Sequence, residues 1–161
     1  MARSPLTRFA HIDDSLAVGS APTDADLPWL AGAGLDAVVC LQSDADLAAH
    51  GVVWTEREAA ATAAGLALAR VPIIDFEPDD LLRHLDDAVR AVRRFHHAGR
   101  RVYVHCNAGL NRSPSVVIAA LMDREDWSLK QAWKHVLRRH RCLPYESVMV
   151  AWATRHRHRL S

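Results

Sequence analysis

Short apolar runs that alternate with helix-like segments are the feature that most constrains the fold of this chain. The segment 80–97 shows the helical character most clearly, because its apolar residues recur every three or four positions and fall on one face. Runs with the length and composition of buried strands occur at 16–19, 35–41, 66–74 and 101–105. Strands that alternate with helices predict an α/β fold with a central, mostly parallel sheet flanked by helices.

Further helices are expected around these strands. One begins at Asp24, and another runs to residue 64 behind a Thr55 cap. Asp80 is expected to cap the helix over 80–97. Three more are expected over 113–122, over 129–139 and after Pro144. No internal repeat or linker interrupts the pattern, so a single domain over 1–161 is expected.

Composition argues against several classes of function. The formal net charge is +1, so no global basic field points to nucleic acid or to an anionic membrane. No apolar stretch resembles a signal peptide or a membrane span. The three cysteines, Cys40, Cys106 and Cys142, are scattered and odd in number, which favours a cytoplasmic protein with free thiols over a disulfide framework. No cofactor and no metal are expected, since the ten histidines are dispersed and are interpreted as surface groups.

One segment carries the chemistry. Residues 104–114 read V-H-C-N-A-G-L-N-R-S-P and lie between an apolar strand and an apolar helix. A tight loop at the N-terminus of a helix presents backbone N–H groups without intrahelical partners, and the helix dipole there favours negative charge. Gly109 suits a loop that curls closely around a tetrahedral group. The segment therefore predicts an anion-binding loop.

The reactive side chains of this loop suit phosphate chemistry. Cys106 begins the loop, where the same field stabilises a thiolate nucleophile. Arg112 ends the loop and offers a planar fork for two phosphate oxygens. Ser113 is predicted to donate its hydroxyl to the cysteine sulfur. His105 is predicted to have a supporting role, because strand alternation turns it away from the loop.

The stretch resembles the His-Cys-x5-Arg-Ser/Thr signature of the protein tyrosine phosphatase superfamily. The resemblance implies a metal-independent, two-step hydrolysis of phosphomonoesters through a phosphocysteine. The short chain is more similar to the dual-specificity branch, which implies phosphotyrosine and phosphoserine or phosphothreonine in proteins as substrates. The residues it implies for phosphate binding, besides Arg112, are Asn107, Ala108, Gly109, Leu110 and Asn111.

A general acid is needed because an alkoxide is a poor leaving group. The stretch 71–80 follows a predicted strand and contains several carboxylates. In the dual-specificity branch the acid lies in a similar loop, which points to Asp75, with Asp79 as the alternative. An acid that works beside a thiolate predicts a bell-shaped pH profile with a mildly acidic optimum.

Several segments resemble the catalytic domains of plant starch-dephosphorylating glucan phosphatases. They are Leu41–Leu47, Asp75–Glu77, Cys106–Leu110 and Cys142–Pro144. The resemblance makes phosphoglucan an alternative substrate and gives Phe76 either a sugar-stacking role or an anchoring one. Asn111 departs from the glycine of those enzymes and favours a second alternative, an RNA 5′-triphosphatase, against which the near-neutral charge counts. The oligomeric state, and whether Cys40 or Cys142 takes part in redox regulation, are left open.

Overall fold

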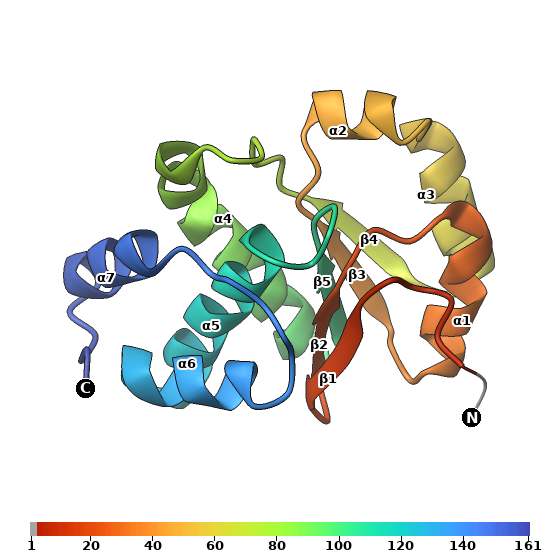
Figure 1. The fold of residues 1–161 in the computed structure, drawn as a ribbon. Helices are drawn as coiled ribbons and strands as arrows, with labels where there is room; N and C mark the ends of the chain where they lie inside the picture. Colours follow the sequence, from red (N-terminus) through yellow and green to blue (C-terminus); the bar gives the residue numbers. More distant parts are fainter. Residues whose placement is uncertain (1–2) are drawn as a thin grey trace.

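The computed structural model describes residues 3–161 and contains one five-stranded sheet in the order β1-β2-β5-β3-β4 (Figure 1). β1 is antiparallel to β2, and every other neighbouring pair is parallel. This confirms the predicted α/β fold with a mostly parallel sheet. The strands are β1 (Phe9–Asp13), β2 (Leu16–Gly19), β3 (Ala37–Cys40), β4 (Ala67–Arg70) and β5 (Val102–His105).

Helices cover both faces of the sheet. In Figure 1, α4 to α7 lie on one side, and α1 and α3 lie on the other. Strand alternation explains the two cores, since Val104 of β5 packs under α4 and α5 whereas its neighbour Tyr103 packs under α1 and α3. The helices are α1 (Leu27–Gly32, preceded by a 3-10 turn over Asp24–Asp26), α2 (Asp44–Ala49), α3 (Trp54–Ala63), α4 (Pro78–His97), α5 (Arg112–Glu125), α6 (Leu129–Leu137) and α7 (Glu146–Arg155).

Two predicted caps are wrong. α3 begins at Trp54 with Val53 as its N-cap, so Thr55 lies inside the helix. α4 begins at Pro78, which places Asp80 in its first turn, where its carboxylate accepts a hydrogen bond from the Ile74 N–H at 2.8 Å. Proline at the first helical position needs no N–H partner, which explains the earlier start. Asp80 therefore anchors the preceding loop instead of capping the helix.

Two elements were not predicted from the sequence. β1 has no clear alternation of apolar and polar residues, and it is an edge strand whose side chains are mostly half-buried. α2 has only six residues and is stabilised by a capping box, in which Ser43 Oγ accepts from the Asp46 N–H and the Asp46 carboxylate accepts from the Ser43 N–H. Six residues are too few for a helical period to show.

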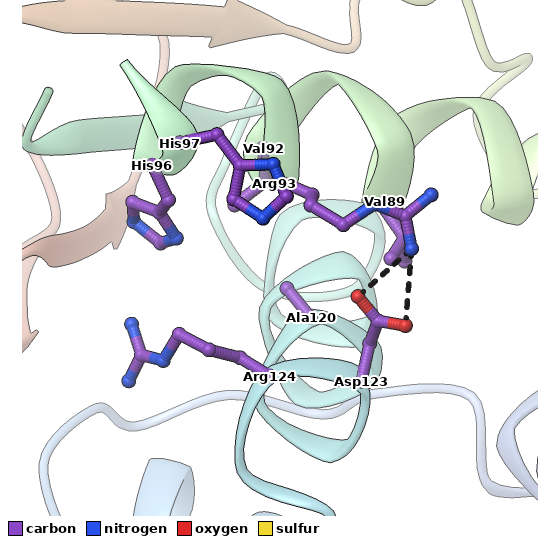
Figure 2. Close-up of a pocket in the computed structure, with 8 residues that line it drawn as sticks. All are labelled: Val89, Val92, Arg93, His96, His97, Ala120, Asp123 and Arg124. Carbon is purple, nitrogen blue, oxygen red and sulfur yellow. Dashed lines mark hydrogen bonds and ion pairs between the residues drawn. The ribbon is translucent and has the colours of Figure 1, made fainter. Parts of the chain in front are cut away.

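A pocket of about 190 Å³ lies between α4 and α5 (Figure 2). Val89, Val92 and Ala120 give it an apolar lining, and an ion pair between Arg93 and Asp123 borders it. None of the predicted site residues lines this pocket. In the part of the chain that the structure describes, no helix is both long and apolar enough to cross a membrane.

Candidate active site

The predicted anion-binding loop, residues 106–111, connects β5 to α5 and is called the catalytic loop below. All four residues of β5 are buried, and the strand lies between β2 and β3 in the middle of the sheet. The loop therefore emerges at the carboxyl edge of the parallel strands, directly before the positive end of the α5 dipole. This is the edge at which open α/β sheets bind their ligands.

Every carbonyl group of the loop from Cys106 to Leu110 accepts a hydrogen bond. One donor, His105, is the residue next to the loop, and the other four come from segments distant in sequence. The pairs are Cys106 O with His105 Nδ1 (3.0 Å), Asn107 O with Ala21 N (2.9 Å), Ala108 O with Arg8 Nη1 (3.2 Å), Gly109 O with His140 Nε2 (2.6 Å) and Leu110 O with Leu143 N (2.8 Å).

These bonds orient the amide groups of the loop. In a trans peptide the C=O and the next N–H point in opposite directions. Because the carbonyls of residues 106–110 are held by groups around the loop, the N–H groups of residues 107–111 are turned toward its centre. Successive N–H groups that converge in this way form a concave site for an anion.

Gly109 makes the tight path of the loop possible. Its φ is +74°, in the left-handed region that favours glycine. A Cβ at this position would lie 2.5 Å from the carbonyl carbon of Gly19, at the end of β2. The backbone of the loop thus packs directly on the backbone of a neighbouring strand, as the prediction of a close-curling loop requires.

Cys106 and Ser113 are brought together, as predicted. The Cys106 side chain is buried, and its Sγ lies 3.3 Å from Ser113 Oγ. The Ser113 hydroxyl also lies 3.2 Å from the Gly19 carbonyl oxygen, to which it can donate. One rotation of the hydroxyl therefore directs its proton to the sulfur or to the carbonyl.

Arg112 is buried, and both of its terminal nitrogens have partners, whereas its Nε has none in the described part of the chain. Its Nη1 donates to the Asp46 carboxylate and to the Ile73 carbonyl, both at 2.7 Å. Its Nη2 lies 3.2 Å from the Asp75 carboxylate. Its Nε is buried and has no partner within the described residues. A buried donor without a partner is costly, so Nε marks a position where a bound anion would be stabilised.

Asp46 was not predicted as a site residue. Besides Arg112, it accepts a hydrogen bond from Asn107 Nδ2 at 2.8 Å, and Asn107 Oδ1 in turn accepts from Gln42 Nε2 at 2.9 Å. Burial alone would raise the pKa of Asp46, but the hydrogen bonds from Arg112, the Ser43 N–H and Asn107 lower it to about 2. Asp46 is therefore a charged partner that fixes both the first turn of the loop and its arginine. The capping-box spacing from Ser43 to Asp46 was the sequence signal for its position.

Of the two candidate acids, the structure brings Asp75 to the catalytic loop. Asp75 contacts Arg112, whereas Asp79 is exposed in the first turn of α4 and makes no ion pair or hydrogen bond within the described residues. Phe76 follows Asp75 with a φ of +60° and is 75% exposed. A bulky residue in the left-handed region carries backbone strain, of the kind that clusters at functional sites. The hydrophobic-anchor interpretation of Phe76 is not supported by this exposure.

Two histidines form hydrogen bonds with carbonyl groups of the loop. His105 is fully buried, and desolvation lowers its pKa to about 4, so it is neutral and donates from Nδ1 to the Cys106 carbonyl. His140 is also buried and holds the Gly109 carbonyl, which corrects the expectation that the histidines are surface groups. The Arg-Arg-His-Arg context of His140 suggested solvent exposure, but the neighbouring segment turns back to the loop.

The other two cysteines and Asn111 lie in packed surroundings. Cys40 and Cys142 are buried free thiols, and burial raises the pKa of each to about 11. The Asn111 side-chain amide lies between the carbonyls of Leu110 and Leu143, and the orientation that satisfies both turns its nitrogen toward them, at 3.2 and 2.6 Å. Asn111 thus fastens the catalytic loop to the segment before α7.

Comparison with known proteins identifies the family of this chain. Residues 18–151 match the family model "Dual specificity phosphatase, catalytic domain". The chain is 32% identical over 136 residues to dual specificity protein phosphatase 12 of Rattus norvegicus, covering 83% of this chain and 37% of that protein. It is 30% identical over 148 residues to the chloroplastic phosphoglucan phosphatase LSF1 of Arabidopsis thaliana, covering 91% of this chain and 25% of that protein. The chain thus spans well under half the length of these relatives.

A solved structure of similar size has the same fold. Human DUSP28 superimposes with a TM-score of 0.72 and 25% identity, and the match covers 97% of this chain and 99% of that one. The resemblance to dual-specificity phosphatases and to plant phosphoglucan phosphatases, predicted from the sequence, is confirmed. The chain belongs to the dual specificity phosphatase catalytic-domain family, and so to the cysteine-dependent phosphatases.

Proposed function

We propose that this chain hydrolyses phosphomonoesters through a phosphocysteine intermediate, with phosphoproteins as its substrates. The observation that carries the proposal is the placement of the Cys106 sulfur at the start of a loop whose amides converge and whose Arg112 has a free, buried Nε. Amides and a guanidinium so placed would hold the equatorial oxygens of a phosphoryl group and stabilise charge as it develops. The fork of Nε and Nη2 suits two of those oxygens.

The reaction has two steps. The Cys106 thiolate attacks phosphorus, a P–S bond forms, the P–O bond to the alcohol breaks, and the leaving oxygen takes a proton from Asp75. Water then attacks the phosphocysteine, Asp75 takes a proton from that water, and the P–S bond breaks to release phosphate. Ser113 donates its hydroxyl proton as a hydrogen bond to the departing sulfur, which the 3.3 Å separation supports. Neither step uses a metal ion.

The substrate class rests on two observations. Similarity to a dual specificity protein phosphatase over 83% of this chain supports phosphoproteins. The alternative is a phosphoglucan, which is supported by similarity to LSF1 and by the exposed ring of Phe76 beside Asp75. An aromatic face of this kind can stack on the apolar face of a sugar. The second alternative, an RNA 5′-triphosphatase, rests on Asn111, and the near-neutral net charge counts against it.

Phosphate release by wild type, Cys106→Ser and Cys40→Ser tests the proposal. The substrates are phosphotyrosyl peptide, phosphothreonyl peptide and phosphorylated amylopectin. Cys106→Ser is expected to abolish release, and Cys40→Ser is expected to retain it, since Cys40 is buried and its serine replacement can keep the hydrogen bond to Gln42. A chelator is expected to change nothing. Turnover by Cys106→Ser within tenfold of wild type would overturn the nucleophile, and preference for amylopectin would overturn the protein substrate.

A further inference from the structure

Arg8 is held in place beside the catalytic loop by its own backbone. Its N–H donates to Ser20 Oγ at 3.0 Å, and its carbonyl accepts from the Ser20 N–H at 3.0 Å and from Ser20 Oγ at 3.1 Å. Ser20 is buried directly after β2, next to the residue that donates to the Asn107 carbonyl. The segment before β1 therefore delivers Arg8 to the loop as a fixed part of the fold.

The guanidinium of Arg8 has unused capacity. Its Nη1 donates to the Ala108 carbonyl at 3.2 Å, which is one of five N–H donors that an arginine carries. Within residues 3–161 it makes no ion pair, unlike Arg57, Arg70 and Arg101, each of which pairs with an aspartate. A full positive charge with free donors thus lies at the rim of a site built for phosphate.

A second arginine lies in the connection between α6 and α7, which contacts the same loop. His140 and Leu143 bond to the carbonyls of Gly109 and Leu110, the two loop residues after the one that Arg8 contacts. Arg141 lies between His140 and Leu143 in the chain, is exposed, and makes no ion pair in the described part of the chain. Arg8 thus contacts the loop directly, and Arg141 adjoins a residue that does.

Such a rim suits a substrate that carries a second anionic group. The amides and Arg112 would bind the scissile phosphate, and the arginines outside the loop would meet whatever lies next to it on the substrate. A neutral sugar chain offers these arginines no charge, whereas a peptide with carboxylates or a second phosphate beside the phosphorylated residue does. Arginine is the side chain best suited to both groups, since its fork binds carboxylate and phosphate alike.

We propose that Arg8 and Arg141 form an anion subsite that selects phosphopeptides with an acidic group beside the phosphorylated residue. This inference rests on the proposed protein-phosphatase function and names the substrate feature that the site recognises. The two arginines are specificity residues, and they take no part in bond making or breaking.

The test measures binding, so that it does not depend on turnover. Labelled phosphotyrosyl peptides, flanked by either two aspartates or two asparagines, are titrated into Cys106→Ser protein at low salt. Two exposed ion pairs predict that the aspartate peptide binds about threefold to tenfold more tightly. In Cys106→Ser with Arg8→Gln and Arg141→Gln, the ratio of the two dissociation constants is expected to fall close to one. Using a ratio cancels any general damage to the loop.

Matched controls sharpen the test. Arg100→Gln removes an exposed arginine before β5, at the opposite end of the strand from the catalytic loop, and is expected to keep the ratio. Arg141→Gln alone is expected to lower it in part. A third peptide with a flanking phosphoserine tells carboxylate recognition from recognition of a second phosphate. Equal dissociation constants for all three peptides, or a ratio that the double arginine variant leaves unchanged, would overturn the subsite.

The proposed function fails separately. If wild-type protein releases no phosphate from any peptide, the protein-phosphatase proposal is wrong. The binding ratio in Cys106→Ser still decides whether the arginines recognise an acidic flank.

Discussion

The carboxylate of Asp75 lies 3.2 Å from Arg112 Nη2, so it is within reach of a phosphate ester that the guanidinium holds. Asp75→Asn keeps the shape of the side chain but removes the proton that the leaving oxygen needs. We expect a loss of about 100-fold or more in kcat/KM for alkyl phosphates, and a much smaller loss for aryl phosphates with acidic leaving groups. Rates with a series of leaving groups measure this difference.

Asp79→Asn is the matched control for Asp75→Asn, because Asp79 is exposed on α4. It is expected to keep wild-type rates with both kinds of ester. A loss in Asp75→Asn that is equal for good and poor leaving groups would assign the acid role elsewhere.

Asp46 serves two donors at once, Arg112 Nη1 and Asn107 Nδ2. An asparagine at 46 has one oxygen, so one of the two donors would face an amide nitrogen. We expect Asp46→Asn to lower kcat/KM by about tenfold to 100-fold, because a displaced guanidinium no longer fits the transition state. Asp44→Asn, on the same turn of α2 but with a 93% exposed side chain, is expected to have little effect. Similar losses in both variants would show that α2 as a whole, and not Asp46, matters.

The catalytic loop is stable as an element because its backbone contacts the end of β2. Gly109→Ala would place a Cβ 2.5 Å from Gly19 and would strain a φ of +74°. We expect a loss of about 1–3 kcal/mol in the free energy of unfolding and a larger proportional loss of phosphate binding. Urea denaturation and titration with a phosphate analogue measure the two quantities. Gly51→Ala provides the comparison, since φ is also positive there but the Cβ meets nothing within 4 Å.

Among the secondary-structure elements, helix α2 and the start of helix α4 were not predicted, and the hydrogen bonds at their N-termini explain why. Ser43 and Asp46 show a capping box within six residues, and this pattern is visible in the sequence once a helix is suspected. The start of α4 was missed because Asp80 has the composition of a cap, while its carboxylate is used by the Ile74 N–H. Strand β5 and the loop after it were predictable, because three β-branched or aromatic residues, Val102 to Val104, directly precede the His-Cys-x5-Arg-Ser motif.

For the whole molecule, His105 makes the free energy of unfolding depend on pH. Desolvation lowers its pKa from 6.5 to about 4, so the folded state resists protonation while the unfolded state binds a proton below about pH 6.5. The free energy of unfolding is therefore expected to fall as pH decreases from 6.5 to 4. At about 1.4 kcal/mol per pKa unit, the contribution of this residue is about 3 kcal/mol. Urea denaturation at several pH values measures it.

His105→Asn is the variant that isolates this contribution, because its amide nitrogen can replace Nδ1 as donor to the Cys106 carbonyl. Its free energy of unfolding is expected to fall less steeply with acid than that of wild type. Parallel pH dependences of the two proteins would contradict the assignment.

The whole chain also shows where prediction from sequence stops. Cys106, Arg112 and Ser113 are adjacent in the sequence, so their meeting was foreseeable, and the loop before α4 pointed to Asp75. Arg8 and His140 were not foreseen, because they reach the loop from more than 30 residues away, and only the paired strands and packed helices bring them there. Contacts of this kind depend on tertiary structure, and neither Arg8 nor His140 belongs to a sequence motif that indicates a function.

The convergent groups of the catalytic loop are main-chain amides, which every residue except proline possesses. Replacing a side chain at Ala108 or Leu110 is therefore expected to leave the proposed phosphate donors in place, provided that the path of the backbone is kept. That path is set by Gly19, Gly109 and the groups that hold the loop carbonyls. Substitutions that keep this backbone path are therefore expected to preserve the proposed reaction. Substitutions of the exposed side chains around the loop can then change the substrate without changing the chemistry.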